Sequence, residues 1–204
     1  LRKRMAVMAT NPTMLTGLSG NVSIPRMTST STAYFVGESG APTESQQAFD
    51  QVNMTPKTIG AFVDYSRRLL LQSSIDVETM IRDDIARVIA TKLDNAAIYG
   101  SGSSNEPLGI KDTTGVGTST ITTFGTFAEY IALETDDAAA NADVANMYYL
   151  INASARGALK STEKATNTGQ FVFENNEING YPAIVSNQLA NNDVLFGDFS
   201  HYVI

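Results

Sequence analysis

The sequence predicts an α+β fold organised around one long helix. Three observations support this prediction. A helical pattern runs without interruption to Gly100, a ribbon-like pair of strand patterns precedes it, and strand and helix patterns alternate after it. With 204 residues, 43% of them hydrophobic, the chain can form one large or two small globular units with a real core.

The long helix is predicted from about residue 74 to residue 99. Ser73 followed by Asp76 resembles the start of a capping box, and Gly100 is a natural C-terminal stop. About 24 residues at a rise of ~1.5 Å each give a helix roughly 36 Å long. Its predicted core face carries apolar residues at helical spacing: Ile81, Ile85, Val88, Ile89 and Leu93. On this pattern alone, an ordinary amphipathic helix of a globular enzyme is the leading interpretation.

The strands before the helix predict a long two-stranded ribbon. Strand patterns at 22–24 and 33–36 lead into the turn-forming segment 37–45. The chain returns through 52–54 and an alternating apolar run at 59–65. An isolated ribbon is marginally stable in water, so we expect it to lie on its own domain or on a neighbouring subunit. An ordinary surface hairpin fits the pattern equally well.

The second half of the chain predicts a mixed α/β region that begins near residue 112. A linker or irregular hairpin at 111–123 precedes it. The predicted helices are residues 124–142 and 153–160, and the predicted strands are residues 147–151, 170–173, 180–185, 194–196 and 201–204.

The sequence carries few signatures of catalysis or ligand binding. His201 is the only histidine, and without a nucleophile elbow to partner it we expect a strand histidine. The glycine-rich segments 100–104 and 115–120 lack the lysine of a phosphate loop and the third glycine of a dinucleotide fingerprint. The chain has no cysteine, and its net charge of −7 argues against tight binding of nucleic acid or anionic membranes. We expect no catalytic residue, cofactor or metal site, and no membrane partner.

Several segments together resemble one known family. They are the stretch PKTIGAFVDYSRRLL (56–70), the helix end NAAIYGSG (95–102) and the turn EPLGI (106–110), followed by YLIN (149–152), GYPAIV (180–185) and LFGDF (195–199). In order and spacing they are similar to the major capsid proteins of tailed bacteriophages with the Hong Kong 97-type fold. The resemblance runs from about residue 20 to the end of the chain.

The resemblance implies a domain division. Residues 1–33 are the N-terminal segment of a peripheral domain, and residues 34–57 form an extended loop, a β-ribbon. Residues 58–111 continue the peripheral domain with the spine helix at about 74–99, and residues 112–204 form an axial domain. Members of the family continue beyond the last strands of this chain, so we expect a C-terminal continuation.

The function implied by the resemblance is that of a major capsid protein, with no enzymatic role. Such a protein of a tailed phage or prophage self-assembles as hexamers and pentamers into an icosahedral head around double-stranded DNA, without reading its sequence. Portal, scaffold and maturation protease are the further partners implied, the virion is the implied location, and synthesis takes place in the bacterial host cytoplasm. An encapsulin-like nanocompartment shell stays open, and a hydrolase or a surface-binding module is a distant alternative.

The tip of the extended loop is the candidate subunit interface. Its candidate residues are Glu38, Ser39, Pro42, Glu44 and Ser45. Some members of the family join a lysine of this loop covalently to an asparagine of a neighbouring subunit. The corresponding place here falls near Ala41-Pro42, so we do not expect that cross-link.

Overall fold

The computed structural model describes residues 5–41, 43–68, 76–122, 124–142 and 146–204. The chain divides into two compact units. The smaller unit is Thr16–Thr58, and the larger unit combines Leu1–Leu15 with Ile59–Ile204.

The larger unit is built on a five-stranded mixed sheet with the strand order β4-β5-β6-β3-β7. Its strands are β3 (Met147–Ile151), β4 (Phe173–Glu174), β5 (Glu177–Ile178), β6 (Tyr181–Val185) and β7 (Leu195–Asp198). The central β3 pairs in parallel with β6 and antiparallel with β7. A parallel pair needs a crossover connection, and the segment between β3 and β6 supplies it.

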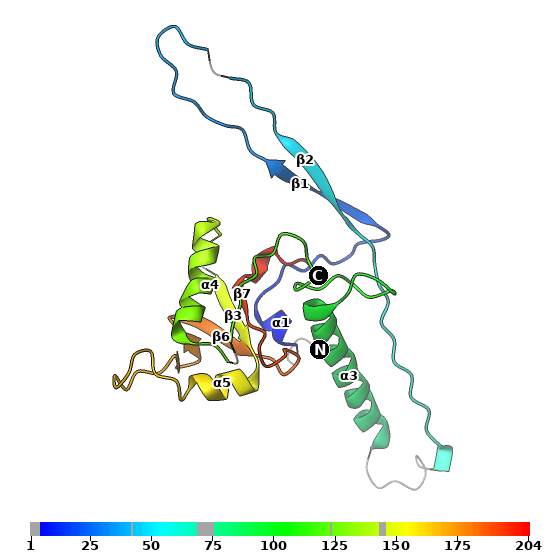
Figure 1. The fold of residues 1–204 in the computed structure, drawn as a ribbon. Helices are drawn as coiled ribbons and strands as arrows, with labels where there is room; N and C mark the ends of the chain where they lie inside the picture. Colours follow the sequence, from blue (N-terminus) through cyan, green and yellow to red (C-terminus); the bar gives the residue numbers. More distant parts are fainter. Residues whose placement is uncertain (1–4, 42, 69–75, 123, 143–145) are drawn as a thin grey trace. The chain divides into compact units, whose positions relative to one another are not determined.

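Helices cover both faces of this sheet (Figure 1). On one face, α4 (Phe127–Ala139) and α5 (Ala153–Leu159) pack over a core that contains Tyr149 and Ile151 of β3. On the other, α1 (Ala6–Ala9) and the end of α3 (Val77–Tyr99) pack over Leu150. Because successive side chains of a strand point to opposite faces, the apolar run of β3 supplies both cores.

The long helix confirms the predicted spine in type and in its end at Gly100. Its first turn differs from the predicted one. Asp76 is itself the N-cap, and its carboxylate accepts a hydrogen bond from the Thr79 N–H at 3.2 Å. Ser73 lies outside the described residues, so the expected pairing of Ser73 with Asp76 stays a prediction, and among the described residues Asp76 is the cap.

The turn after α3 folds back onto the end of the helix. Gly109 donates its N–H to the Gly100 carbonyl at 2.8 Å, and Ile110 and Lys111 donate theirs to Ala97 and Ile98. These bonds satisfy carbonyl groups that a helix end leaves open. The approach is close enough that a Cβ on Gly109 would lie 2.5 Å from the Gly100 nitrogen and 2.6 Å from the Ile98 oxygen.

Gly109→Ala is therefore expected to lower the free energy of unfolding by about 2 to 3 kcal/mol, because backbone atoms must move to admit the methyl group. Gly157→Ala is the matched control. No heavy atom lies within 4 Å of the Cβ that this change adds inside α5, so it should stabilise the protein slightly. Urea unfolding of both variants measures the difference, and equal effects would contradict the close approach at Gly109.

The structure corrects several predicted boundaries. Residues 33–36 and 59–65 form no strand, because no neighbouring chain segment pairs with them within the described residues. The first predicted axial helix is shorter than 124–142, since Phe124 and Gly125 have positive φ angles of 69° and 74°. The predicted strand at 170–173 is reduced to Phe173–Glu174, although Phe171 forms an isolated bridge with Glu163.

The predicted strand at 201–204 is also wrong. His201 ends a short 3-10 helix, Phe199–His201, and only Val203 pairs, as a parallel bridge with Thr13. The Thr13 N–H donates to the Tyr202 carbonyl at 2.9 Å, and the Ile204 N–H donates to the Thr13 carbonyl at 3.0 Å, so the segment at Thr13 is bonded to the last residues of the chain.

Candidate assembly surfaces

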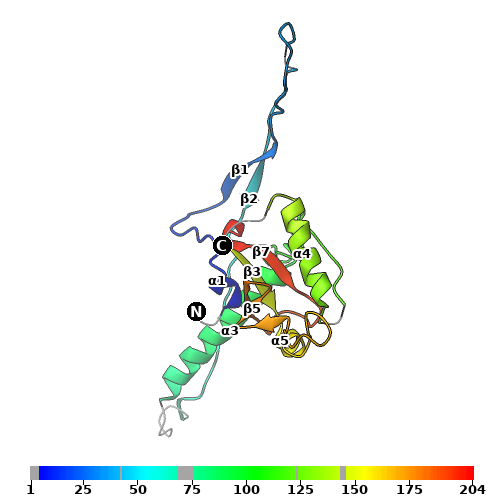
Figure 2. The same cartoon turned by 90° about the vertical axis from the view of Figure 1, so that its left-hand side faces the viewer.

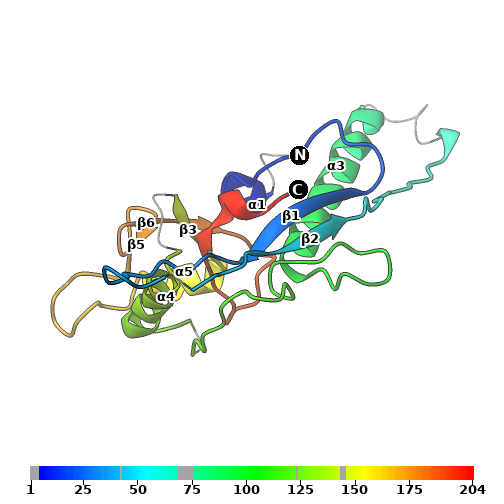
Figure 3. The same cartoon turned by 90° about the horizontal axis from the view of Figure 1, so that it is seen from above.

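The smaller unit is a hairpin of two antiparallel strands, β1 (Val22–Ser29) and β2 (Ala48–Met54). The strands run side by side, as Figures 2 and 3 show. Pairing begins at Val22 opposite Met54 and ends at Ser29 opposite Ala48, with an irregularity between Met27 and Ser29. The paired ribbon thus begins before the expected boundary at residue 34, and residues 30–47 connect its strands.

This hairpin has almost no interior. Only three of its strand residues, Val22, Ile24 and Met54, are even half-buried. Met27 and Phe49 face each other across the ribbon, yet their exposed fractions are 50% and 68%. A two-stranded hairpin that buries so little is marginal in water, and clustered exposed apolar side chains mark interaction surfaces.

The predicted interface residues lie in the connection between the strands. Glu38, Ser39 and Glu44 are exposed, whereas Ser45 is half-buried and its Oγ accepts a hydrogen bond from the Thr32 N–H at 3.1 Å. Pro42 lies outside the described residues. Ser45 thus joins the two sides of the connection.

The sequence-based selection missed the apolar part of this connection. Tyr34, Phe35 and Val36 are consecutive and exposed, and the Phe35 side chain is completely open to solvent. The signal in the sequence is three apolar residues in a row within a Ser/Thr-rich segment, a pattern that also predicts a strand.

The apolar face of α3 forms a second exposed surface. Ile81, Ile85, Ile89 and Leu93 are half-buried, and Val88 is 52% exposed. The buried residues of α3 are concentrated in its second half, where Ala97 and Ile98 pack with Val7 and Leu150. Within the described residues the predicted core face is therefore only partly covered, because the sheet reaches only the last turns of the helix (Figure 1).

The geometry around His201 does not form a hydrolase triad. His201 is exposed, and its Nε2 lies 3.7 Å from Asp198 Oδ2. Ser200 donates its hydroxyl directly to Asp198 Oδ2 at 2.8 Å. A triad requires the imidazole between the hydroxyl and the carboxylate, and here the serine bypasses it.

The described part of the chain contains no group of three or more His, Asp or Glu side chains that could hold a metal ion. None of the helices in that part combines the length and apolar character needed to cross a membrane.

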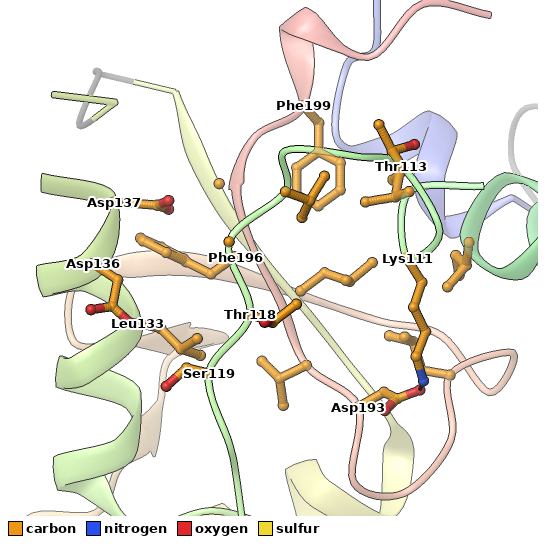
Figure 4. Close-up of a pocket in the computed structure, with 18 of the residues that line it drawn as sticks. Lys111, Thr113, Thr118, Ser119, Leu133, Asp136, Asp137, Asp193, Phe196 and Phe199 are labelled. Carbon is orange, nitrogen blue, oxygen red and sulfur yellow. Dashed lines mark hydrogen bonds and ion pairs between the residues drawn. The ribbon is translucent and has the colours of Figure 1, made fainter. Parts of the chain in front are cut away.

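A cavity of about 420 Å³ lies between α4, β7 and the loop that follows α3 (Figure 4). Leu133, Phe196 and Phe199 contribute apolar walls. At one side Asp193 Oδ2 accepts hydrogen bonds from Tyr99 OH at 2.5 Å and from Lys111 Nζ at 2.8 Å. Burial alone raises the pKa of Asp193, but the bonds from Lys111 and Tyr99 outweigh it, so that the net pKa is lowered.

The same cluster makes alkaline stability depend on Tyr99. Burial first, and then the neighbouring Asp193 carboxylate, raise the pKa of Tyr99 from 10.0 to about 12. Because the folded-state pKa is raised, its stabilising contribution is complete below pH 10 and is lost as the pH rises through 12. Tyr99→Phe should cost about 1 kcal/mol at neutral pH, and that difference should shrink between pH 10 and 12. Urea unfolding across this pH range measures it, and a constant difference would contradict the assignment.

Comparison with solved structures defines the class of fold. The capsid of a native GTA particle matches with a TM-score of 0.74 and 19% identity, covering 96% of this chain and 74% of that chain. A structure from Mycobacterium phage Bobi matches with a TM-score of 0.71 and 17% identity, covering 98% of this chain and 70% of that one. The fold is the Hong Kong 97-type capsid fold, as the sequence predicts.

Sequence comparison gives the family. The model of the phage capsid family matches residues 1–204. The major capsid protein of Halomonas phage phiHAP-1 is 35% identical over 205 residues, which is all of this chain and 34% of that protein. The major capsid protein of Klebsiella oxytoca phage phiKO2 is 33% identical over 93 residues, or 46% of this chain and 22% of that protein. The chain belongs to the phage capsid family, and it spans about a third or less of the length of these two relatives.

Proposed function

We propose that this chain is the shell-forming part of a major capsid protein, which self-assembles into the head of a tailed phage or prophage. The observation that carries the proposal is the hairpin Thr16–Thr58, a unit of its own with exposed apolar side chains and almost no interior, in a chain of the phage capsid family. A surface of this kind is stabilised when another protein covers it.

The partner that covers the hairpin is a second copy of the chain. A shell places many identical subunits side by side. A surface that one subunit leaves uncovered can therefore bind a neighbour in the same way at every position in the shell. Phe35 and its two apolar neighbours supply aromatic and aliphatic contacts of the kind that dominate interfaces. Glu38, Ser39 and Glu44 supply a polar rim around them.

The exposed first half of α3 provides a second contact surface. Met80 and Val88 are 61% and 52% exposed on a helix whose other half is anchored in the core. In this proposal α3 is the spine of a peripheral domain formed by residues 1–33 and 58–111. Residues 34–57 belong to its extended loop, which the pairing of β1 with β2 extends back to Val22. Residues 112–204 form the axial domain around the centres of pentamers and hexamers.

The role of the chain is structural and not enzymatic, and its location is the virion after synthesis in the bacterial host. The shell encloses double-stranded DNA without specific contacts, which the net charge of −7 favours because an acidic wall does not hold a polyanion tightly. Portal, scaffold and maturation protease are the further partners of this assembly.

Sedimentation of the full-length gene product that contains this chain tests the proposal. Expressed together with its neighbouring genes, it should sediment as rings of five or six copies or as closed shells. A product that stays monomeric under every salt and co-expression condition would contradict a shell function. DNA inside the particles distinguishes a phage head from a compartment that encloses an enzyme.

A further inference from the structure

The turn between β5 and β6 carries the only Asn-Gly pair of the sequence, Asn179-Gly180. Ile178 pairs with Tyr181, so these two residues form the entire connection. Both have positive φ angles, 51° and 90°, as a type I′ hairpin turn requires. Both are exposed to solvent.

The Asn179 side chain is held by a carboxylate of α4. Its Nδ2 donates a hydrogen bond to Glu134 Oε2 at 2.7 Å. The other oxygen, Glu134 Oε1, accepts from the hydroxyl of Tyr149 at 2.7 Å, and Tyr149 is fully buried in the sheet core. Hydrogen bonds to a charged acceptor are stronger than those between neutral groups. Glu134 thus ties the turn to α4 and to β3.

An asparagine that precedes glycine is prone to deamidation, because no Cβ hinders the approach of the following backbone nitrogen. After losing its proton to solvent base, the Gly180 nitrogen attacks the Asn179 Cγ. The new N–Cγ bond forms, the Cγ–Nδ2 bond breaks, and the amide nitrogen takes up one proton from solvent and leaves as ammonia. Water then opens the succinimide to aspartate or isoaspartate, with no change in oxidation state.

We propose that Asn179 is the deamidation site of this chain, and that Glu134 is a positioning residue that slows the reaction in the folded protein. The hydrogen bond to Glu134 fixes the amide that must swing toward Gly180, and the turn fixes the backbone on both sides of it. The aspartate product would place a second carboxylate against Glu134, so an attraction becomes a repulsion. Deamidation would therefore release the β5–β6 turn from α4.

The neighbouring turn provides internal controls. Asn175 and Asn176 connect β4 and β5, and Asn175 has the same φ of 51° as Asn179. Asn176 is followed by Glu177, whose side chain hinders attack by the backbone nitrogen. Within the described residues the Asn175 side chain has no hydrogen-bond partner, so it matches Asn179 in turn position and lacks the tie to Glu134.

Peptide mass spectrometry after incubation at mildly alkaline pH tests the proposal on the folded protein and on protein unfolded in urea. In Glu134→Ala, the Asn179 amide loses its hydrogen bond to a charged acceptor. The deamidation rate at Asn179 in the folded protein should therefore rise by about tenfold. Tyr149→Phe keeps the bond between Glu134 and Asn179 and should leave that rate unchanged. In urea, all variants should react equally fast at Asn179, and faster there than at Asn176.

Equal rates for folded wild type and Glu134→Ala would overturn the role of Glu134, and a rate at Asn179 no higher than at Asn176 in urea would overturn the site. If Glu134→Ala proves poorly folded by circular dichroism, Glu134→Gln decides. Glutamine keeps the size of the side chain but offers a neutral acceptor. The deamidation rate of Glu134→Gln should therefore lie between those of the wild type and of Glu134→Ala, and a rate equal to that of the wild type would overturn the proposal.

The consequence of the modification is tested by mimicking its product. Asn179→Asp should lower the melting temperature by about 2 to 4 °C more than Asn175→Asp, because only the first change replaces a hydrogen bond to the Glu134 carboxylate by a second carboxylate at that contact. An equal shift for the two variants would overturn the proposed coupling between the turn and α4.

Discussion

Asp94→Ala should lower the free energy of unfolding of the larger unit by about 3 kcal/mol. Asp94 is only 2% exposed, in the second half of α3. Its Oδ1 accepts the Val7 N–H at 2.9 Å, and its Oδ2 accepts the Ser186 hydroxyl at 3.0 Å. One buried carboxylate therefore joins the spine helix to α1 and to the segment after β6. Removing it leaves two buried donors without their acceptor, which is the costly outcome for a buried polar group.

Asp84→Ala is the matched control for this prediction. Asp84 lies on the same helix, and its exposed carboxylate pairs with Arg87 three residues further on. Exposed ion pairs contribute little, so this variant should stay within about 0.5 kcal/mol of the wild type. Urea unfolding followed by far-UV circular dichroism measures both changes. Similar losses for the two variants would show that Asp94 does not link these elements.

Deleting residues 37–45 should abolish shell formation while the larger unit keeps its stability. The segment contributes nothing to either core cluster, so its removal costs the larger unit no buried contacts. In the proposed shell, it supplies the polar rim of a contact repeated in every subunit. Phe35→Ser removes the fully exposed aromatic side chain next to the deleted segment. Truncating such an anchor costs about 2 kcal/mol or more of binding free energy, which raises the dissociation constant of each contact more than tenfold.

Two controls separate assembly from folding in this experiment. Phe35→Tyr keeps the aromatic ring and should assemble, whereas Phe35→Ser should not. Thermal unfolding of the unassembled variants should match that of the wild type. A large loss of thermal stability on deleting 37–45 would show instead that this segment packs within its own chain, and normal shells from Phe35→Ser would exclude it as an anchor.

The sequence predicts the elements that have local signals. The spine helix ends at Gly100, where the turn that follows approaches the backbone so closely that only a glycine fits. The bounds of β3, α5 and β6 agree closely with those predicted from the sequence. The extended segments 33–36 and 59–65 have strand patterns too, but a strand forms only where a partner pairs with it. A single sequence does not reveal that partner.

The candidate surfaces show the same limit. A helical pattern identifies the apolar face of α3, yet it cannot distinguish a face buried in the chain from one buried between chains. Val88 belongs to that face and is 52% exposed. Asp94 shows the converse, since a charged residue in a helical pattern is expected on the solvent side and here joins three segments of the core. Such long-range pairings carry no local signal.

Electron microscopy of the full-length gene product, expressed with its neighbouring genes, tests whether this chain builds a shell. Closed shells are expected in which this fold repeats in rings of five and six, with density from the hairpin Thr16–Thr58 lying on an adjacent subunit. Particles in which every hairpin folds back onto its own subunit, or a product that never leaves the monomeric state, would contradict it.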